Sequence, residues 1–339
     1  MKMPGFFLLL GVMALSARGE RLYYVNDFLN NGGGARPMAL GEAMAADFQD
    51  RSSGFYNPCG ILGFERLTLL ASHAVLFKGL LDYTFASGVY PLRKDRAVGA
   101  YFVRSAVDEI WDTRGFETDD DGRPIYSSAR LRFVDNADYA AGFSYAALWR
   151  ERLRYGLTLK FIRRRFADLT SFGTALDAGV QYLHPFGWTF GLMGRNLTTS
   201  LNRYYEDVWE IGLPEVFPGV GFRKDVEYLY GGITLLYQFP NLLPTSGVSQ
   251  GAFGGAFDFE GQAPSGNSLT ENPVRFILNG NLGAEYHYHN KLFVRLGTNP
   301  VDLVTAGAGI RIGRLVADMA LRHHPDLDDG YRLAVSWDF

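Results

Sequence analysis

Histidine residues occur at spacings that could bind a metal ion. His287 and His289 stand two positions apart, and His323 and His324 are adjacent. Zinc sites usually combine such residues with cysteines or further ligands at regular spacing. The single cysteine, Cys59, is far from them in sequence, and no second segment repeats the pattern. We therefore expect no bound metal ion.

The acidic stretch 117–128, ETDDDGRPIYSS, matches the beginning of a calcium-binding EF-hand loop. Its acidic residues alternate up to Gly122, as the ligands of that loop do. The twelfth position is Ser128, however, where the loop requires a bidentate glutamate. We interpret the stretch as an acidic surface loop.

The sequence does not predict an enzyme. The stretch GVSQG at 247–251 lies in a segment rich in Pro, Gly and Ser, whereas a nucleophile elbow needs its serine in a Gly-x-Ser-x-Gly run after a strand. Nothing resembles a phosphate-binding loop, and we expect no cofactor. The balance of 33 Lys and Arg against 36 Asp and Glu supplies no basic face for nucleic acid.

Other charged residues belong to no recognised motif. Each of them lies on the polar face of a segment in which apolar and polar residues alternate. Segments 155–165, 174–183 and 304–313 show this alternation. Six residues are predicted to line the interior of a barrel: Lys160, Asp177, Arg195, Glu285, His287 and Arg311. Further candidates for this interior face are Gln181, Arg295, Asp318 and Arg322. They could form a gated polar path or a structural ladder of ion pairs. Buried charges of both signs favour the ladder.

Alternation of this kind predicts β-strands, since successive side chains of a strand point to opposite faces. It is clearest in 275–289, where alternate residues from Phe276 to Tyr288 are apolar or small and share one face. Similar segments separated by turn residues fill 66–339 and predict an all-β fold. A soluble sandwich or barrel and a transmembrane antiparallel β-barrel both fit. An export signal, many long strands and aromatic residues at strand ends favour the transmembrane barrel.

The first 19 residues have the composition of a signal peptide. Lys2 precedes an apolar run from Phe6 to Leu15, and Ala17 and Gly19 are small residues suited to cleavage. A short N-terminal anchor is the alternative. No later stretch approaches the roughly 18 uninterrupted apolar residues of a membrane helix. The sequence thus predicts an exported, multi-pass barrel in a bacterial outer membrane.

The last ten residues, GYRLAVSWDF, alternate up to the end of the chain. The apolar face consists of Tyr331, Leu333, Val335, Trp337 and Phe339. This pattern is similar to the C-terminal signal read by the barrel assembly machinery of the outer membrane. Phe339 could also serve to close the barrel against its first strand, and the two roles are compatible. We expect the assembly machinery and outer-membrane lipid as partners.

Residues 20–65 do not alternate and separate the signal from the barrel. Residues 38–48 predict a short helix after Pro37, and YNPCG predicts a turn. GARPMALGEAMAA and YNPCGI together resemble the N-terminal region of the PorV/PorQ family, within the FadL-like outer-membrane barrels. The matching residues include Arg36, Gly41, Asn57, Pro58 and Gly60.

The resemblance continues through later stretches such as ALDAGVQY and GLMGRNL. It implies a barrel of about 14 strands, with residues 20–65 folded inward as a partly helical plug or hatch. A barrel of that size is too wide for its own side chains to fill, so such a segment would occupy the interior. Arg36 could then pair with a wall carboxylate such as Asp177 or Glu285, or else cap a turn outside the barrel.

Two functions follow from the resemblance. FadL-like barrels imply passive uptake of a hydrophobic small molecule, such as a fatty acid or aromatic compound. PorV-like members imply a component of type IX secretion that receives or shuttles secreted cargo proteins without small-molecule transport. Within 240–273, Leu242, Leu243, Phe253 and Phe257 could line a hydrophobic groove or pack within their own loop. A continuous apolar path would favour uptake, and a sealed lumen would favour secretion.

Overall fold

The computed structural model describes residues 21–22, 26–112, 132–166, 169–198, 200–203, 209–212, 214–243, 273–302, 304–324 and 328–339. The predicted signal peptide, the acidic stretch 117–128 and most of the segment 240–273, with Phe253 and Phe257, lie outside these residues. Among the described helices, none has both the length and the apolar character needed to cross a membrane.

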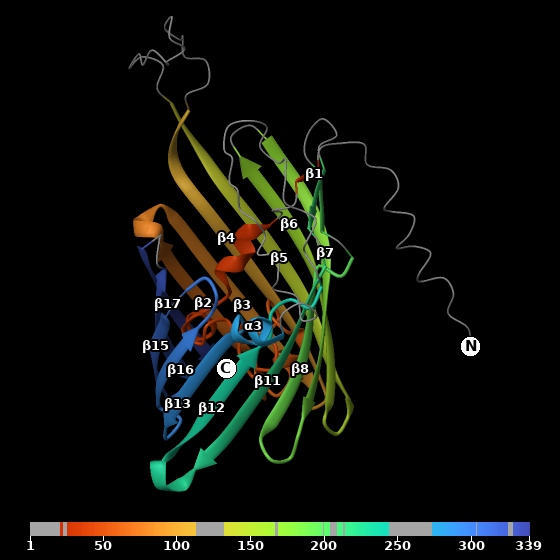
Figure 1. Ribbon diagram of the computed structural model, residues 1–339, viewed down its shortest axis with the longest axis vertical. Coiled ribbons are helices and arrows are strands. Elements are labelled where there is room, and N and C mark those ends of the chain that lie inside the picture. The colour runs from red at the N-terminus through yellow and green to blue at the C-terminus, as the bar shows by residue number, and fades with distance from the viewer. Residues whose placement is uncertain are drawn as a thin grey trace, which may run out of the picture.

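The described residues form 17 strands of one sheet, with a few short helices (Figure 1). The strands are β1 (Arg21–Leu22), β2 (Thr68–Leu76), β3 (Leu81–Arg93), β4 (Arg96–Asp112), β5 (Arg132–Arg150), β6 (Leu153–Phe166), β7 (Leu169–Leu183), β8 (Trp188–Arg195), β9 (Ser200–Arg203), β10 (Trp209–Gly212), β11 (Glu215–Val226), β12 (Gly231–Gln238), β13 (Asn281–Tyr288), β14 (Leu292–Thr298), β15 (Val304–Ile312), β16 (Leu315–His324) and β17 (Asp328–Asp338). The helices are η1 (Asp27–Asn31), α2 (Ala35–Ala39), η2 (Pro58–Ile61), η3 (Phe77–Gly79), η6 (Glu227–Leu229) and α3 (Pro273–Leu278).

All strands except β1, β9 and β10 form a closed antiparallel ring, which leaves 14 strands in the barrel. Strands β2 to β8 pair in order, β8 pairs with β11, and β11 to β17 continue in order until β17 pairs with β2. Strands β9 and β10 pair as a hairpin, β9 also reaches β7, and β1 pairs in parallel with β10. The predicted all-β barrel of about 14 strands is confirmed.

The two ends of the barrel differ in the length of their connections. The turn end carries the two-residue connections 94–95, 151–152 and 313–314. It also holds the C-terminus, where the Phe339 backbone N–H donates to the Leu67 carbonyl at 2.9 Å. The loop end carries η3 and the longer connections, including 239–280. In Figure 1 the loop end is above and the turn end below.

Side chains alternate between the two faces of the wall as the sequence predicts. In β6, the apolar residues at alternate positions from Tyr155 to Phe161 are exposed on the outside, whereas Thr158 and Lys160 between them are buried inside. In β2, Leu69 and Val75 are exposed and the residues between them alternate accordingly. The outer face is therefore an apolar belt of the kind that a lipid environment requires.

Two local predictions are wrong. Residues 276–278 belong to α3, and the strand of that segment begins at Asn281. The helix predicted at 38–48 instead occupies Ala35–Ala39, and turns follow it. Gly41 and Glu42 both have positive φ values, 60° and 61°, and a right-handed helix cannot continue through that conformation.

Candidate functional site

The inner segment, which we define as residues 26–65, lies inside the barrel and touches its wall on all sides (Figure 1). Helix α2 packs on β14 to β17, and η2 packs on β4 to β7. Between them, Ala45 lies against β8 and β11, and the Met44 backbone N–H donates to Gln238 Oε1 of β12 at 3.2 Å. The segment therefore extends across the interior from one wall to the other.

Glycines on the inner face of the wall allow this close approach, and sequence reasoning missed their role. A Cβ at Gly191 would lie 2.0 Å from the Ala45 carbonyl oxygen, and one at Gly179 would lie 1.9 Å from Asn57 Oδ1. The wall glycines that contact the inner segment in this way are Gly156, Gly179, Gly191, Gly219, Gly283, Gly297 and Gly307. Glycine at inward positions of otherwise alternating strands was the available signal, because such glycines mark close backbone approach.

Gly41, one of the predicted plug residues, lies directly against the wall backbone. Its N–H donates to Thr305 Oγ1 at 3.1 Å, and Thr305 in turn donates to the Ala39 carbonyl. A Cβ at this position would lie 2.5 Å from the Thr298 carbonyl oxygen. A positive φ and this contact together require glycine.

Asn57, Pro58 and Gly60 build the predicted turn at η2. The Asn57 side chain caps this helix by accepting from the Cys59 N–H at 3.2 Å, and its amide donates to the Ala45 carbonyl at 2.6 Å. Pro58 takes the first helical position, where it suits the fixed φ. Cys59 is fully buried, and this burial raises the pKa of its thiol to about 12. Its sulfhydryl is therefore protonated and shielded.

Arg36 pairs with three carboxylates, one of which joins the inner segment to the wall. It lies 2.5 Å from Asp47, 3.0 Å from Asp50 and 2.9 Å from Glu285, and the last of these belongs to β13. Asp47, Asp50 and Glu285 are buried. The cluster therefore offsets the cost of removing charge from water by pairing opposite charges.

Further arginines extend this cluster along the wall. Arg295 of β14 lies 2.5 Å from Glu285 and 2.6 Å from Asp318, and Arg223 of β11 lies 3.2 Å from Asp47. Arg295 and Asp318 were among the further candidates for the interior face, whereas Arg223 was not predicted. Arg223 also stands at an inward position of an alternating strand, so the same rule that selected Glu285 could have found it.

The other predicted interior residues are dispersed. Lys160 and Asp177 form a buried pair at 2.9 Å, so Asp177 does not contact Arg36. Arg195 lies over the ring of Tyr56 at 6.0 Å from its centroid. His287 lies 3.4 Å from the exposed Asp225. The sixth residue, Arg311, lies over Phe293. These six positions line the wall, but the structure does not bring them together in one site.

A second buried cluster surrounds Glu42, and sequence reasoning did not identify it. The Tyr56 hydroxyl donates to Glu42, and Arg332 of β17 donates to the Asn31 carbonyl at 2.6 Å. Burial raises the pKa of the Glu42 carboxyl, while the positive charge of Arg332 acts in the opposite direction. Phe55 packs edge-on against Tyr56 within this cluster.

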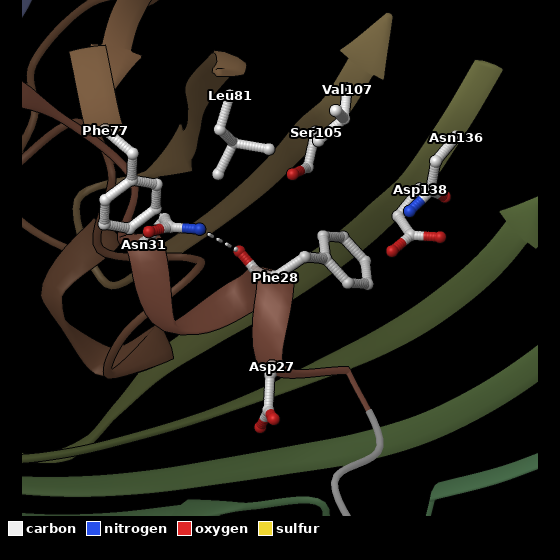
Figure 2. A pocket seen from close by; sticks show the side chains of 9 residues that line it. All are labelled: Asp27, Phe28, Asn31, Phe77, Leu81, Ser105, Val107, Asn136 and Asp138. Carbon is white, nitrogen blue, oxygen red and sulfur yellow. Dashed lines mark hydrogen bonds between the residues drawn. The ribbon is translucent and has the colours of Figure 1, made fainter. Parts of the chain in front are cut away.

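A cavity of about 320 Å³ lies beside η1, toward the loop end (Figure 2). The inner segment contributes Asp27, Phe28 and Asn31, and the wall contributes residues of β3, β4 and β5 together with η3. Figure 2 shows Phe77 and Leu81 on one side and Asn136 and Asp138 on the other, with the Phe28 ring between them. This arrangement could hold a small molecule with apolar and polar parts.

The C-terminal strand presents its predicted apolar face to the outside. Tyr331, Leu333, Val335, Trp337 and Phe339 are all exposed. The strand also closes the ring, since Tyr331 lies opposite Val75 of β2. Next to the terminus, Asp338 lies 2.7 Å from Arg51 of the inner segment. Closure and an exposed terminal aromatic residue therefore coexist.

Metal ligands do not gather in the described part of the chain, where no group of three or more His, Cys, Asp or Glu side chains could hold an ion. His287 instead faces Asp225, and His323 lies 2.8 Å from Asp329. The calcium-like stretch 117–128 is outside the described residues.

No protein-family model matches this chain, and no curated protein matches its sequence. Among solved structures, the P. putida toluene transporter TodX aligns with a TM-score of 0.59 and 10% sequence identity, covering 91% of this chain and 99% of TodX. The CymD monoaromatic hydrocarbon channel aligns with a TM-score of 0.54 and 12% identity, covering 91% and 98% of the two chains. These similarities show that the chain shares the barrel fold of the two channels.

Proposed function

We propose that this protein is an outer-membrane channel for the passive uptake of hydrophobic small molecules. The observation that carries the proposal is the inner segment, which contacts the wall on all sides and leaves a partly apolar cavity toward the loop end. An open pore for hydrophilic solutes needs a water-filled lumen. A filled barrel with a mixed cavity is better suited to selective binding of a small, partly apolar solute.

The surface and the fold support the same proposal. The apolar outer belt fits a lipid environment, and the predicted signal peptide would direct the chain to export. TodX and CymD, which share the fold, are described as a toluene transporter and a monoaromatic hydrocarbon channel. A channel of this kind needs no catalytic group and no cofactor. Because the inner segment occupies the lumen, passage along the barrel axis requires that segment to shift.

An uptake assay in cells with an intact lipopolysaccharide layer tests this function. We expect cells that produce the protein to accumulate radiolabelled toluene faster than cells with the empty vector. Uptake of a hydrophilic sugar of similar mass should stay unchanged, which controls for a leaky membrane. Equal toluene uptake in the two strains, at a verified level of folded barrel, would contradict the proposal.

The alternative is a cargo-receiving component of type IX secretion, of the PorV/PorQ type. It rests on the resemblance around Arg36 and Asn57, and no contact in the described part of the chain favours it over uptake. Native mass spectrometry of the gently extracted barrel separates the two functions. A retained small aromatic or lipid-sized mass supports uptake, whereas a bound secreted protein without a small ligand supports secretion.

A further inference from the structure

The cavity beside η1 has a polar side built from two neighbouring strands. Ser105 comes from β4, and Asn136 and Asp138 come from β5. Ser105 and Asp138 are more than nine-tenths buried, with exposed fractions of 5% and 7%. The Ser105 hydroxyl and the half-buried Asn136 amide form no hydrogen bond with other described residues. Buried polar groups of this kind favour a ligand that hydrogen-bonds to them.

The charges around this polar side are already compensated. Asp138 lies 3.3 Å from Arg164 of β6, and Arg322 of β16 donates to Asn31 Oδ1 at 3.1 Å. Neither arginine lines the cavity. A bound carboxylate would therefore meet Asp138 and the exposed Asp27, which also lines the cavity, without a cation on the cavity wall. A bound ammonium at Asp138 would compete with Arg164. A neutral ligand fits better than an ion of either sign.

The opposite side of the cavity is apolar. Phe77 and Leu81 lie across from Asp138, and the Phe28 ring lies between the two sides (Figure 2). Val107 lies next to Ser105 on β4 and adds one apolar side chain to the polar side. A volume of about 320 Å³ is at the lower end of the range for small-molecule sites. Aromatic rings of this kind pack well against another ring.

We propose that this cavity binds a small neutral aromatic compound that carries a hydroxyl group, a phenol in the simplest case. Its ring packs on Phe28 and Phe77, and its hydroxyl hydrogen-bonds with Ser105, Asn136 and Asp138. This inference rests on the proposed uptake function and narrows its substrate class. A site built to hydrogen-bond a hydroxyl discriminates against the analogue that lacks it, because that analogue leaves buried polar groups unpaired.

Phenol and toluene provide the test, since they differ by a hydroxyl in place of a methyl group. Binding of each is measured calorimetrically on the full-length barrel in detergent, and a titration into empty micelles is subtracted. We expect phenol to bind about tenfold more tightly than toluene. In Ser105→Ala and Asn136→Leu the preference should shift toward toluene by about tenfold, because the polar side is lost.

Ser72→Ala is the matched control. Ser72 has the same exposed fraction as Ser105, 5%, and its buried hydroxyl also lacks a hydrogen-bond partner among the described residues. It does not line the cavity, so the phenol preference should stay unchanged in this variant. Heat-modifiable migration on gels confirms that every variant has folded.

The possible outcomes separate the inference from the proposed function. If toluene binds as tightly as phenol, the hydroxyl-selective site is overturned, even if cells still accumulate toluene. Benzoate is titrated in the same way as a charged aromatic compound, and tightest binding by benzoate also overturns the site. An unchanged preference in both Ser105→Ala and Asn136→Leu overturns it as well. If neither compound binds, the site is overturned, and the cellular uptake assay then decides whether the proposed function fails with it.

Discussion

Gly41 and Gly313 have the same backbone conformation but different surroundings, which makes them a useful pair. Their φ values are 60° and 62°. A Cβ on Gly41 would lie 2.5 Å from the Thr298 carbonyl oxygen, whereas one on Gly313 would meet nothing within 4 Å. Backbone strain therefore applies to an alanine at either position, but a collision with the wall applies at Gly41 alone.

We expect Gly41→Ala to destabilise the protein more than Gly313→Ala does. The left-handed conformation costs an alanine roughly 1–2 kcal/mol at both positions, and overpacking adds about 1–3 kcal/mol at Gly41. The free energy of unfolding in urea, measured on the barrel in detergent micelles, checks this difference. Equal losses in the two variants would mean that the inner segment moves away from the wall at little cost.

Sequence reasoning predicted that Arg36 would form an ion pair with a carboxylate of the wall, but it did not predict which carboxylate. Arg36 was expected to meet Asp177 or Glu285, and the structure places it on Glu285, while Asp177 pairs with Lys160. Arg36 and Glu285 are 249 positions apart. Their contact depends on the register of the strands and on the path of the inner segment. Alternation predicts which side chains face inward, but it cannot predict which of them become neighbours.

Two arginines of the inner segment form ion pairs with the wall, and their acidic partners differ in burial. Arg36 reaches Glu285 in the middle of the wall, among buried carboxylates, and Arg51 reaches Asp338 at the turn end. The Asp338 side chain is 28% exposed, compared with 7% for Glu285. Loss of the buried attachment should therefore loosen the segment more than loss of the partly exposed one.

Cys59 reports on this loosening, because it is the single cysteine of the chain and is fully buried in the inner segment. Arg36→Met leaves the buried Asp50 without its cation and removes one of the two cations that pair with Asp47 and with Glu285. Breaking a buried ion pair typically costs about 3–5 kcal/mol. We expect the rate of Cys59 alkylation by a maleimide under native conditions to rise about tenfold or more.

Arg51→Met provides the control, with the same substitution in the same segment. Its more exposed ion pair is worth about 1 kcal/mol or less, so the alkylation rate should change less than about fivefold. If Arg36→Met leaves the rate at its original value, the buried ion pairs do not hold the inner segment in place. The packing of glycines and small residues against the wall would then suffice.

The helix of this segment shows why element boundaries were harder to predict than element types. Composition at 38–48 indicated a helix, but the structure has it at Ala35–Ala39. Positive φ values at Gly41, Glu42 and Gln49 break the chain into turns. The barrel imposes these turns by directing the backbone along its glycine-lined wall, and a local propensity cannot anticipate that constraint.

The barrel itself was the most predictable feature, because closure involves every strand. Fourteen strands with inward polar and outward apolar residues repeat one rule around the ring, and each repetition strengthens the prediction. The excursion through β9 and β10 departs from that rule, since it inserts a hairpin between β8 and β11. Its short strands carry too little alternation to be recognised from sequence.

Closure of the whole ring depends on the last strand, and Phe339 ends it. The Phe339 N–H bonds to the Leu67 carbonyl at 2.9 Å, while its side chain is 51% exposed on the outside. A charged side chain at this position would leave the backbone bond intact but place a charge on the outer face. We expect Phe339→Asp to lower the amount of heat-modifiable barrel in the outer membrane severalfold, because the proposed terminal aromatic signal is lost. The added charge itself costs about 1 kcal/mol or less at a lipid-facing position near the interface.

Phe186→Asp is the control for the added charge. Phe186 lies in the connection between β7 and β8, at the turn end, and is 78% exposed. The Phe186→Asp substitution introduces the same charge at the same end of the barrel without changing the terminus, so assembly should be close to normal. Export is followed separately by the appearance of the processed chain in the periplasm. Normal assembly of Phe339→Asp would show that the closing strand pairs efficiently without its terminal aromatic residue. Equal defects in both variants would assign the effect to charge at the turn end instead of an assembly signal.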